Sequence, residues 1–263
     1  MQFEQHFVDV NGVKTEYYSA GTGEPLVFLH GAGTVMSRLK DLTLAFAKDF
    51  KVILPFHPGF GNSDDNNKMK NMHDYVLHYL ELLDKLDLKH FNLVGHSLGA
   101  WISALFAIEQ SDRIKRLTLA CPPGLKVPGH PGQTPFGHSP EKMMSLLLKY
   151  PETAMKFAPR PDDIDAIVQM YREMTSTARV TWETGSYDRT INQWLHRISV
   201  PTLMLWGSDD RFCPTAHAEE WAKRIPNAEV CIIDDCAHLI FEEKPLESVE
   251  AIRRFFLNAE NSN

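Results

Sequence analysis

Long hydrophobic runs and excess basic charge are both missing from this chain of 263 residues. One of its longest apolar segments, residues 100–108, is much shorter than the roughly 20 residues that a membrane-spanning helix needs, so we expect no membrane partner. Residues 1–9 contain neither the basic nor the apolar region of a secretory signal, which favours a cytoplasmic location. The formal net charge of −7 argues against nucleic acid as a partner.

Cysteines are also few. The chain has 4 of them, Cys121, Cys213, Cys231 and Cys236, and their spacing matches no zinc motif. In the absence of a secretory signal we expect these thiols to be reduced. The spacing of the cysteines therefore predicts no zinc site, and we expect neither a metal nor a cofactor. A homodimer is compatible with this composition, although no pattern specifies it.

Strand and helix patterns alternate along most of the chain, which is typical of an α/β protein with a largely parallel sheet. Asn11-Gly12 marks a hairpin at the start. The predicted strands are residues 7–10, 13–18, 26–30, 51–54, 92–95, 117–121, 202–205 and 229–233. The main predicted helices are residues 37–48, 72–87, 97–109, 216–224 and 245–256.

The alternation stops between residues 122 and 187. Proline and glycine are dense in residues 122–132, and the patterns that follow are short and helical without intervening strands. These short helices are expected at residues 143–150, 151–157 and 162–174. We therefore divide the chain into a core of residues 1–121 and 188–263 and an inserted helical cap of residues 122–187.

A serine lies at the sharpest predicted turn. Residues 95–99, Gly-His-Ser-Leu-Gly, follow a buried strand and precede an apolar helix. In that context the two glycines permit a nucleophile elbow, which lifts Ser97 above the sheet. The alternative is that Ser97 only caps the helix, a role that serine favours. Partners elsewhere in the chain decide between the two.

Candidate partners for Ser97 follow two later strands. Asp209 and Asp210 lie in the turn after the strand at 202–205, and His238 lies in the loop after the strand at 229–233. Open α/β sheets place their sites beyond the carboxyl ends of strands. A serine, a histidine and an aspartate brought together there provide a nucleophile, its base and the group that orients the base.

A glycine-rich loop precedes these residues. Residues 30–33, His-Gly-Ala-Gly, follow the strand at 26–30. Acyl transfer passes through an oxyanion that needs two positioned N–H donors. The backbone N–H groups of Leu98 and Ala32 are the candidates. Taken alone, His30-Gly31 is equally compatible with an ordinary turn at the end of a strand.

These motifs, with Pro-Gly-Phe-Gly-Asn-Ser at residues 58–63, resemble the α/β-hydrolase fold superfamily, in its group of small capped esterase-like enzymes. The resemblance covers essentially the whole chain. It implies a mostly parallel eight-stranded sheet flanked by helices, with an inserted helical cap. The order serine, aspartate, histidine is the one that this fold uses. The family pattern Gly-x-x-Asp-x-x-x-Pro assigns the acid to Asp210, with Asp209 as the second choice.

The chain departs from the family pattern at one position. Phe56 stands where relatives usually carry an aspartate that supports the neighbouring loop. Some relatives place the acid of the triad after the strand at 117–121, but this chain reads Cys-Pro-Pro at 121–123 and offers no carboxylate there. This absence strengthens the assignment to Asp210.

The resemblance implies a serine hydrolase that cleaves a small, mainly apolar ester or lactone through an acyl-enzyme. The candidate substrate contacts are His30, Gly31, Trp101 and Phe136. One alternative is hydrolysis of a carbon–carbon bond in a ring-cleavage product by the same triad; such relatives often carry asparagine at the position of His96, which favours the ester. The other alternative is a small-molecule binding protein without turnover. We expect His73 and His78, on the helix at 72–87, to lie at the surface.

Overall fold

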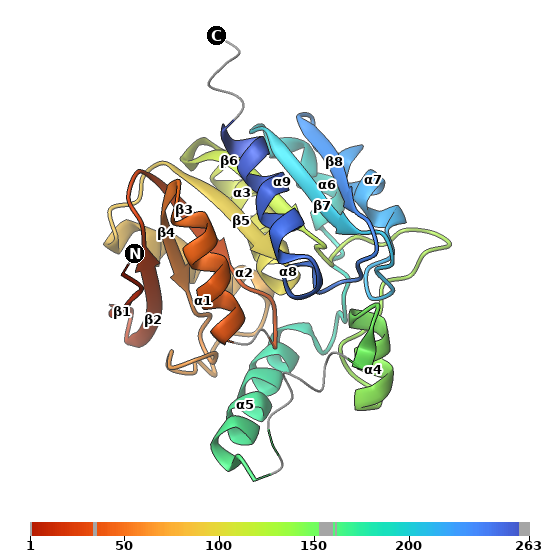
Figure 1. Cartoon of the computed structure of the whole chain (residues 1–263), viewed down its shortest axis with the longest axis horizontal. Helices are drawn as coiled ribbons and strands as arrows, with labels where there is room; N and C mark the ends of the chain where they lie inside the picture. Colours follow the sequence, from red (N-terminus) through yellow and green to blue (C-terminus); the bar gives the residue numbers. More distant parts are fainter. Residues whose placement is uncertain (1, 34–35, 153–159, 161, 258–263) are drawn as a thin grey trace.

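A single sheet of eight strands organises the computed structural model, which describes residues 2–33, 36–152, 160 and 162–257 (Figure 1). The strands are β1 (Glu4–Val10), β2 (Val13–Ala20), β3 (Glu24–Leu29), β4 (Phe50–Pro55), β5 (Phe91–His96), β6 (Ile114–Ala120), β7 (Thr202–Gly207) and β8 (Ala228–Ile233). Their order across the sheet is β1-β2-β4-β3-β5-β6-β7-β8. The predicted fold class is confirmed.

The hairpin predicted at the start of the chain forms the two outermost strands on one side of the sheet. Asn11 and Gly12 both adopt positive φ, 51° and 80°, and pair Val10 with Val13 in antiparallel β1 and β2. β2 is antiparallel to β4, and every pairing from β4 across to β8 is parallel. The carboxyl ends of these parallel strands therefore meet along one edge of the sheet.

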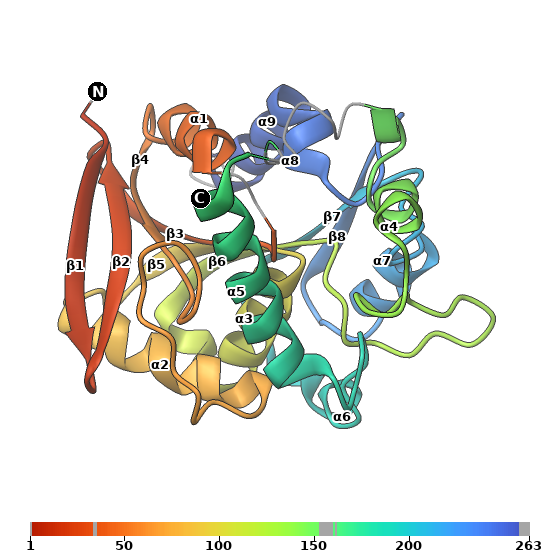
Figure 2. The same ribbon diagram turned by 90° about the horizontal axis from the view of Figure 1, so that it is seen from below.

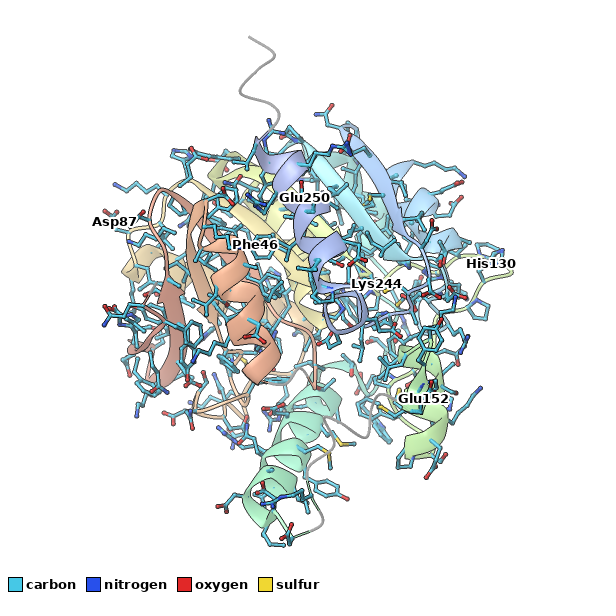
Figure 3. All side chains as sticks on the ribbon, in the orientation of Figure 1. Phe46, Asp87, His130, Glu152, Lys244 and Glu250 are labelled. Atoms are coloured by element: carbon cyan, nitrogen blue, oxygen red, sulfur yellow. The ribbon has the colours of Figure 1, made fainter. Side chains whose placement is uncertain are left out.

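Helices cover both faces of the sheet, with α1 and α9 on one side and α2 and α3 on the other (Figure 2). The helices of the core are α1 (Met36–Phe46), α2 (Met72–Lys85), α3 (Leu98–Glu109), α7 (Ala216–Ala222), α8 (Ile240–Glu243) and α9 (Pro245–Leu257). α3 is apolar around most of its circumference because it is buried on the central strands. Phe46, at the end of α1, packs against Phe28 of β3 with ring centroids 6.4 Å apart (Figure 3).

The surface position expected for His78 is wrong. α2 follows the capping residue Asn71, whose side chain accepts the N–H of Asp74. With the helix starting there, His78 lies on its buried face. The His78 side chain is buried, with Nε2 3.1 Å from the Thr15 hydroxyl of β2. A polar partner on the neighbouring strand therefore allows a histidine on the buried face of this helix.

The chain between β6 and β7 contains α4 (Pro140–Leu147), α5 (Ile164–Thr181) and α6 (Ile191–Trp194). α4 and α5 lie at the same end of the molecule, beyond one edge of the sheet (Figure 1). The two ends of this segment meet, because Gly124 N–H donates to Ser186 and the Gly124 carbonyl accepts from Asp188, both at 2.8 Å. Most of the helix predicted at 151–157 lies outside the described residues.

Two further expectations concern the whole molecule. No disulfide joins any two of the four cysteines. Among the described residues, no helix has the length and the apolar composition needed to cross a bilayer.

Candidate active site

Loops that follow β3, β5, β7 and β8 carry the residues predicted for the site. They begin at His30, Ser97, Ser208 and Asp234, directly after the last residue of each strand. Because these strands are parallel neighbours or near neighbours, their loops gather at one edge of the sheet. Residues that are up to 141 positions apart in the sequence are thereby brought into contact.

The turn at Ser97 is a strained strand-to-helix connection. Ser97 has φ 50° and ψ −114°, a backbone conformation that is rare for a residue with a side chain. A Cβ at Gly99 would lie 2.1 Å from the carbonyl oxygen of Leu29, and one at Gly95 would lie 2.4 Å from Ser103 Oγ. The turn therefore fits only glycine at both positions, and it holds the serine at the sheet edge.

Three predicted residues form one hydrogen-bonded chain. Ser97 Oγ lies 2.8 Å from His238 Nε2, and His238 Nδ1 lies 2.8 Å from Asp210 Oδ2. The other oxygen of Asp210 accepts the backbone N–H groups of Phe212 at 2.9 Å and Cys213 at 2.8 Å. A carboxylate can only accept, so Nδ1 carries the proton and Nε2 accepts from the serine hydroxyl.

The two neighbouring aspartates have different surroundings. The Asp210 side chain is 0% exposed and faces His238, whereas the Asp209 side chain is 32% exposed and faces Lys149 Nζ at 3.0 Å. Hydrogen bonds from Ser208 and Lys149 lower the pKa of Asp209. The geometry therefore puts Asp210, and not Asp209, beside the imidazole.

His96, the residue before the serine, supports the histidine loop. Its Nε2–H donates to the backbone carbonyl of His238 at 3.0 Å, and its ring is buried. Desolvation lowers the pKa of His96 to about 3, so the ring stays neutral and keeps this one donor. His96 thus fixes the backbone of the residue that the serine contacts.

The glycine loop after β3 lies against the serine. A Cβ at Gly31 would lie 3.3 Å from Ser97 Cβ and 3.0 Å from His96 Nδ1. The backbone of Gly31 therefore lies close to the side chain of Ser97. Ala32 is exposed at this edge. Leu98 is the first residue of α3, where an N–H group has no partner within the helix. Leu98 thus adjoins Ser97 in the chain, and Gly31, the residue before Ala32, lies against Ser97 across the sheet edge.

The four predicted substrate contacts lie in different surroundings. His30 and Trp101 are each 2% exposed, and Gly31 is also buried. Trp101 packs beneath Gly124, where an added Cβ would lie 3.3 Å from the indole nitrogen. Phe136 is half-buried, and its ring lies 5.3 Å from that of Trp182 at the end of α5.

Sequence reasoning missed two buried residues beside the site. His57 Nε2 lies 2.8 Å from the His30 carbonyl oxygen, and His57 Nδ1 accepts from the hydroxyl of Tyr79 in α2. Both side chains are almost completely buried. The only sequence signal was position, because His57 directly follows the residue at which the family pattern is broken.

The helical segment between β6 and β7 touches the loops of the site directly. The carbonyl of Leu147, the last residue of α4, accepts the N–H groups of His238 and Leu239, both at 3.1 Å. Lys149 Nζ bridges Asp209 at 3.0 Å and Asp235 at 2.8 Å. The end of α4 therefore holds both the aspartate loop and the histidine loop.

Metal-ligating side chains gather once within the described part of the chain. Ligand atoms of Cys121, Asp210 and His238 lie within 4.8 Å of one another. Asp210 and His238 are already hydrogen-bonded to each other, and burial raises the pKa of the Cys121 thiol well above its usual range. A protonated thiol is a poor metal ligand, so this group does not favour a metal centre.

The sequence matches a family of known proteins. The model of the serine aminopeptidase S33 family matches residues 23–245. This range includes β3 to β8 and every residue of the hydrogen-bonded chain described above. The match spans well over half of the sequence.

Individual relatives are more distant. The chain is 26% identical to a cis-3-alkyl-4-alkyloxetan-2-one decarboxylase from Shewanella oneidensis, over 99% of this chain and 90% of the relative. It is 26% identical to a 2-hydroxymuconate semialdehyde hydrolase from a Pseudomonas species, over 86% of this chain and 84% of the relative.

Among solved structures, a serine hydrolase from the polyaromatic hydrocarbon-degrading bacterium Cycloclasticus zankles superposes with a TM-score of 0.81 at 20% identity, covering 100% of both chains. At that identity the likeness concerns the fold alone, and it agrees with the sheet order and flanking helices seen here. Since the family model matches well over half of the chain, the chain belongs to the serine aminopeptidase S33 family and is a serine hydrolase with the α/β-hydrolase fold.

Proposed function

We propose that this protein hydrolyses a small, mainly apolar ester or lactone, with Ser97 as nucleophile, His238 as base and Asp210 as the group that orients the base. The observation that carries the proposal is the unbroken chain of two 2.8 Å contacts from Ser97 Oγ through His238 to Asp210. Burial of the His238 and Asp210 side chains, 1% and 0% exposed, keeps water from competing for these contacts.

Acylation follows from this geometry. His238 Nε2 takes the hydroxyl proton as Ser97 Oγ bonds to the carbonyl carbon of the substrate, and the carbonyl oxygen becomes an oxyanion. The N–H groups of Ala32 and Leu98 donate to that oxyanion. When the intermediate collapses, the bond to the leaving oxygen breaks and His238 returns the proton to it. The alcohol departs, or remains attached if the substrate is a lactone.

Deacylation repeats the sequence with water. His238 takes a proton from water, the hydroxide oxygen bonds to the acyl carbon, and the proton returns to Ser97 Oγ as the ester bond breaks. The products are a carboxylic acid and an alcohol, or a single hydroxy acid. Asp210 stabilises the imidazolium in both halves and keeps its proton on Nδ1.

The substrate class is supported by a relative and by the inserted segment. The Shewanella relative is named for an oxetan-2-one with two alkyl groups, which is a cyclic ester with apolar substituents. We propose residues 122–187 as a cap over the sheet edge, with Phe136, in contact with Trp182, as part of its apolar lining. Gly31 and the buried rings of His30 and Trp101 would then shape the floor beneath the ester.

Carbon–carbon bond hydrolysis is the second candidate. The Pseudomonas relative, 26% identical, is named as a 2-hydroxymuconate semialdehyde hydrolase. The same serine, histidine and aspartate would serve that reaction, so geometry alone does not separate the two. An assay that follows the loss of absorbance of a dienoate ring-cleavage product distinguishes the two reactions.

The test combines a covalent probe with substrates. A fluorophosphonate should label Ser97 in the wild type and not in Ser97→Ala, and Ser111→Ala removes a serine far from the site as a control. Turnover of 4-nitrophenyl butyrate and of an alkyl-substituted β-lactone should be lost in Ser97→Ala only. Labelling without ester or lactone turnover would redirect the assignment to the carbon–carbon substrate. A folded wild type with neither labelling nor turnover would overturn the proposal in favour of a binding protein.

A further inference from the structure

One peptide unit determines where the Ala32 N–H points. The N–H of Ala32 and the carbonyl of Gly31 belong to the same trans peptide, so they point in opposite directions in one plane. His30 Nδ1 lies 2.7 Å from the Gly31 oxygen. A carbonyl oxygen can only accept, so Nδ1 carries the proton and holds this plane. The orientation of the Ala32 N–H is therefore set by the ring of His30.

The His30 ring is held in turn by His57. With the proton on Nδ1, Nε2 of His30 accepts, and the backbone N–H of His57 donates to it at 3.4 Å. The His57 ring makes a second contact with His30, because its Nε2–H donates to the His30 backbone carbonyl at 2.8 Å. The two ring centroids are 4.1 Å apart. His57 thus contacts both the side chain and the backbone of His30.

Tyr79 completes the series. His57 Nε2 is the donor, so Nδ1 accepts, and it lies against the Tyr79 hydroxyl. The hydrogen bonds therefore place the His57 proton on Nε2 and the His30 proton on Nδ1, with the Tyr79 hydroxyl as donor to His57. Both histidines are neutral, in keeping with burial, which lowers the pKa of His30 to about 4 and holds the pKa of His57 well below its usual range. Phe60 packs edge-on against the two imidazole rings, with centroids 5.5 and 5.3 Å away.

We propose that His57 and Tyr79 are positioning residues that aim the Ala32 N–H at the oxyanion. This inference rests on the proposed function. At the departure from the family pattern, Phe56 offers no carboxylate to the loop. Glu16 of β2 accepts the backbone N–H of Asn62 at 2.7 Å instead, and His57 provides the contact to His30. An N–H that matters only once the oxyanion forms lowers the barrier without tightening substrate binding, so its loss should appear in kcat.

The experiment breaks the hydrogen-bonded chain from Tyr79 through His57 to His30 at two points. His57→Leu deletes both ring contacts, and Tyr79→Phe deletes one hydroxyl and is the milder change. With 4-nitrophenyl butyrate, His57→Leu should lower kcat roughly 10- to 100-fold, as expected for a misplaced oxyanion donor, with KM within about twofold. Tyr79→Phe should lower kcat by roughly 3- to 10-fold on the same ground. His57→Gln, whose amide can donate where Nε2 does, should recover part of the loss.

A second readout separates positioning from general damage. The affinity for butaneboronic acid, which becomes tetrahedral on the serine, should fall by the same factor as kcat/KM. His78→Leu is the matched control, because it removes a buried histidine of α2 whose Nε2 bonds to Thr15. Its ring lies 5.8 Å from that of Tyr79, but the Tyr79 hydroxyl that contacts His57 is kept. The substitution should lower the melting temperature without changing kcat.

Two kinds of failure can be told apart. If the wild type turns over the ester and labels at Ser97, and folded His57→Leu and Tyr79→Phe keep wild-type kcat and boronate affinity, the positioning role is overturned and the proposed function stands. A KM effect alone would overturn it equally. If wild-type Ser97 neither labels nor turns over, the proposed function falls and the positioning role falls with it.

Discussion

The backbone N–H of His238 donates to the carbonyl of Leu147 at 3.1 Å. The inserted segment therefore holds the histidine loop through a main-chain contact that no side-chain substitution removes. Lys149, two residues on, adds ion pairs to Asp209 and Asp235, in the aspartate loop and the histidine loop. The position of α4 is thereby coupled to that of His238, which faces the serine, and to that of the loop that carries Asp210.

Lys149→Ala should loosen this coupling without abolishing activity. Surface ion pairs contribute little individually, so we expect kcat/KM to fall by roughly two- to fivefold and the melting temperature to fall by a few degrees. The melting-temperature difference from wild type should shrink in 1 M NaCl, because salt screens exposed charges. Lys223→Ala, which breaks an ion pair with Glu220 away from the site, is the control and should leave kcat/KM unchanged.

Acid should remove the stability that the ion pairs of Lys149 contribute. Hydrogen bonds from Ser208 and Lys149 lower the pKa of Asp209 below the ordinary 3.8. Hydrogen bonds from Lys149, Tyr150 and Lys244 likewise lower the pKa of Asp235. Groups whose pKa is lowered in the folded state stabilise it above their unfolded pKa and lose that effect as the pH falls through the folded value. The melting-temperature gap between wild type and Lys149→Ala should thus be constant from pH 8 to pH 5 and close towards about pH 2. A gap that widens with acid would contradict the ion-pair explanation.

Asp210→Asn and Asp209→Asn form a matched pair one residue apart. Asn at 210 no longer holds the His238 proton on Nδ1, so kcat should fall by about 10⁴ while the fold is retained. Asn at 209 loses only a partly exposed ion pair, and kcat should stay within about threefold of wild type. Steady-state kinetics with 4-nitrophenyl butyrate and circular dichroism of both variants provide the measurement. Equal losses in the two variants would refute the distinction.

What the sequence could predict follows from local patterns. Apolar strands that end in glycine or a polar turn placed Ser97, Asp210 and His238 in loops at the carboxyl ends of parallel strands. The order of those strands came from the structure. The helix predicted at 162–174 begins close to the start of α5 but stops short of its end at Thr181. The hydroxyls of Thr177 and Thr181 donate to carbonyls four residues earlier, so residues that usually favour turns remain helical.

Buried polar contacts between elements had no such local signal. His57 and His78 are both buried because a hydroxyl on another element, of Tyr79 or Thr15, lies at the right distance. Neither pairing shows in spacing or periodicity, since it depends on how α2 packs against the sheet. For the same reason the contact between Leu147 and His238 was out of reach of sequence reasoning.

Gly99→Ala should test the close approach at the serine turn. A Cβ there would lie 2.1 Å from the Leu29 oxygen and 2.6 Å from the His30 oxygen, and neither backbone atom can move without shifting β3. We expect the free energy of unfolding to fall by about 3 kcal/mol or more. Gly132→Ala is the control, because its nearest neighbours lie 3.7 Å away and it should change stability by less than about 0.5 kcal/mol. Urea denaturation measures both.

Cys121 offers a position from which a carboxylate can reach His238. Its Sγ shares a 4.8 Å neighbourhood with ligand atoms of Asp210 and His238, and its φ of 50° is a conformation that aspartate adopts more readily than most residues. In an Asp210→Asn background, Cys121→Asp should therefore restore kcat by roughly 10-fold or more, since one buried carboxylate replaces another beside the imidazole.

Cys121→Asn in the same background separates charge from shape, because it has the same size and no charge. It should restore nothing, and its kcat should equal that of Asp210→Asn alone. If both double variants fold and neither recovers activity, the carboxylate must approach Nδ1 from the β7 side only. Recovery in Cys121→Asn as well would mean that volume at this position, and not the negative charge, orients the histidine.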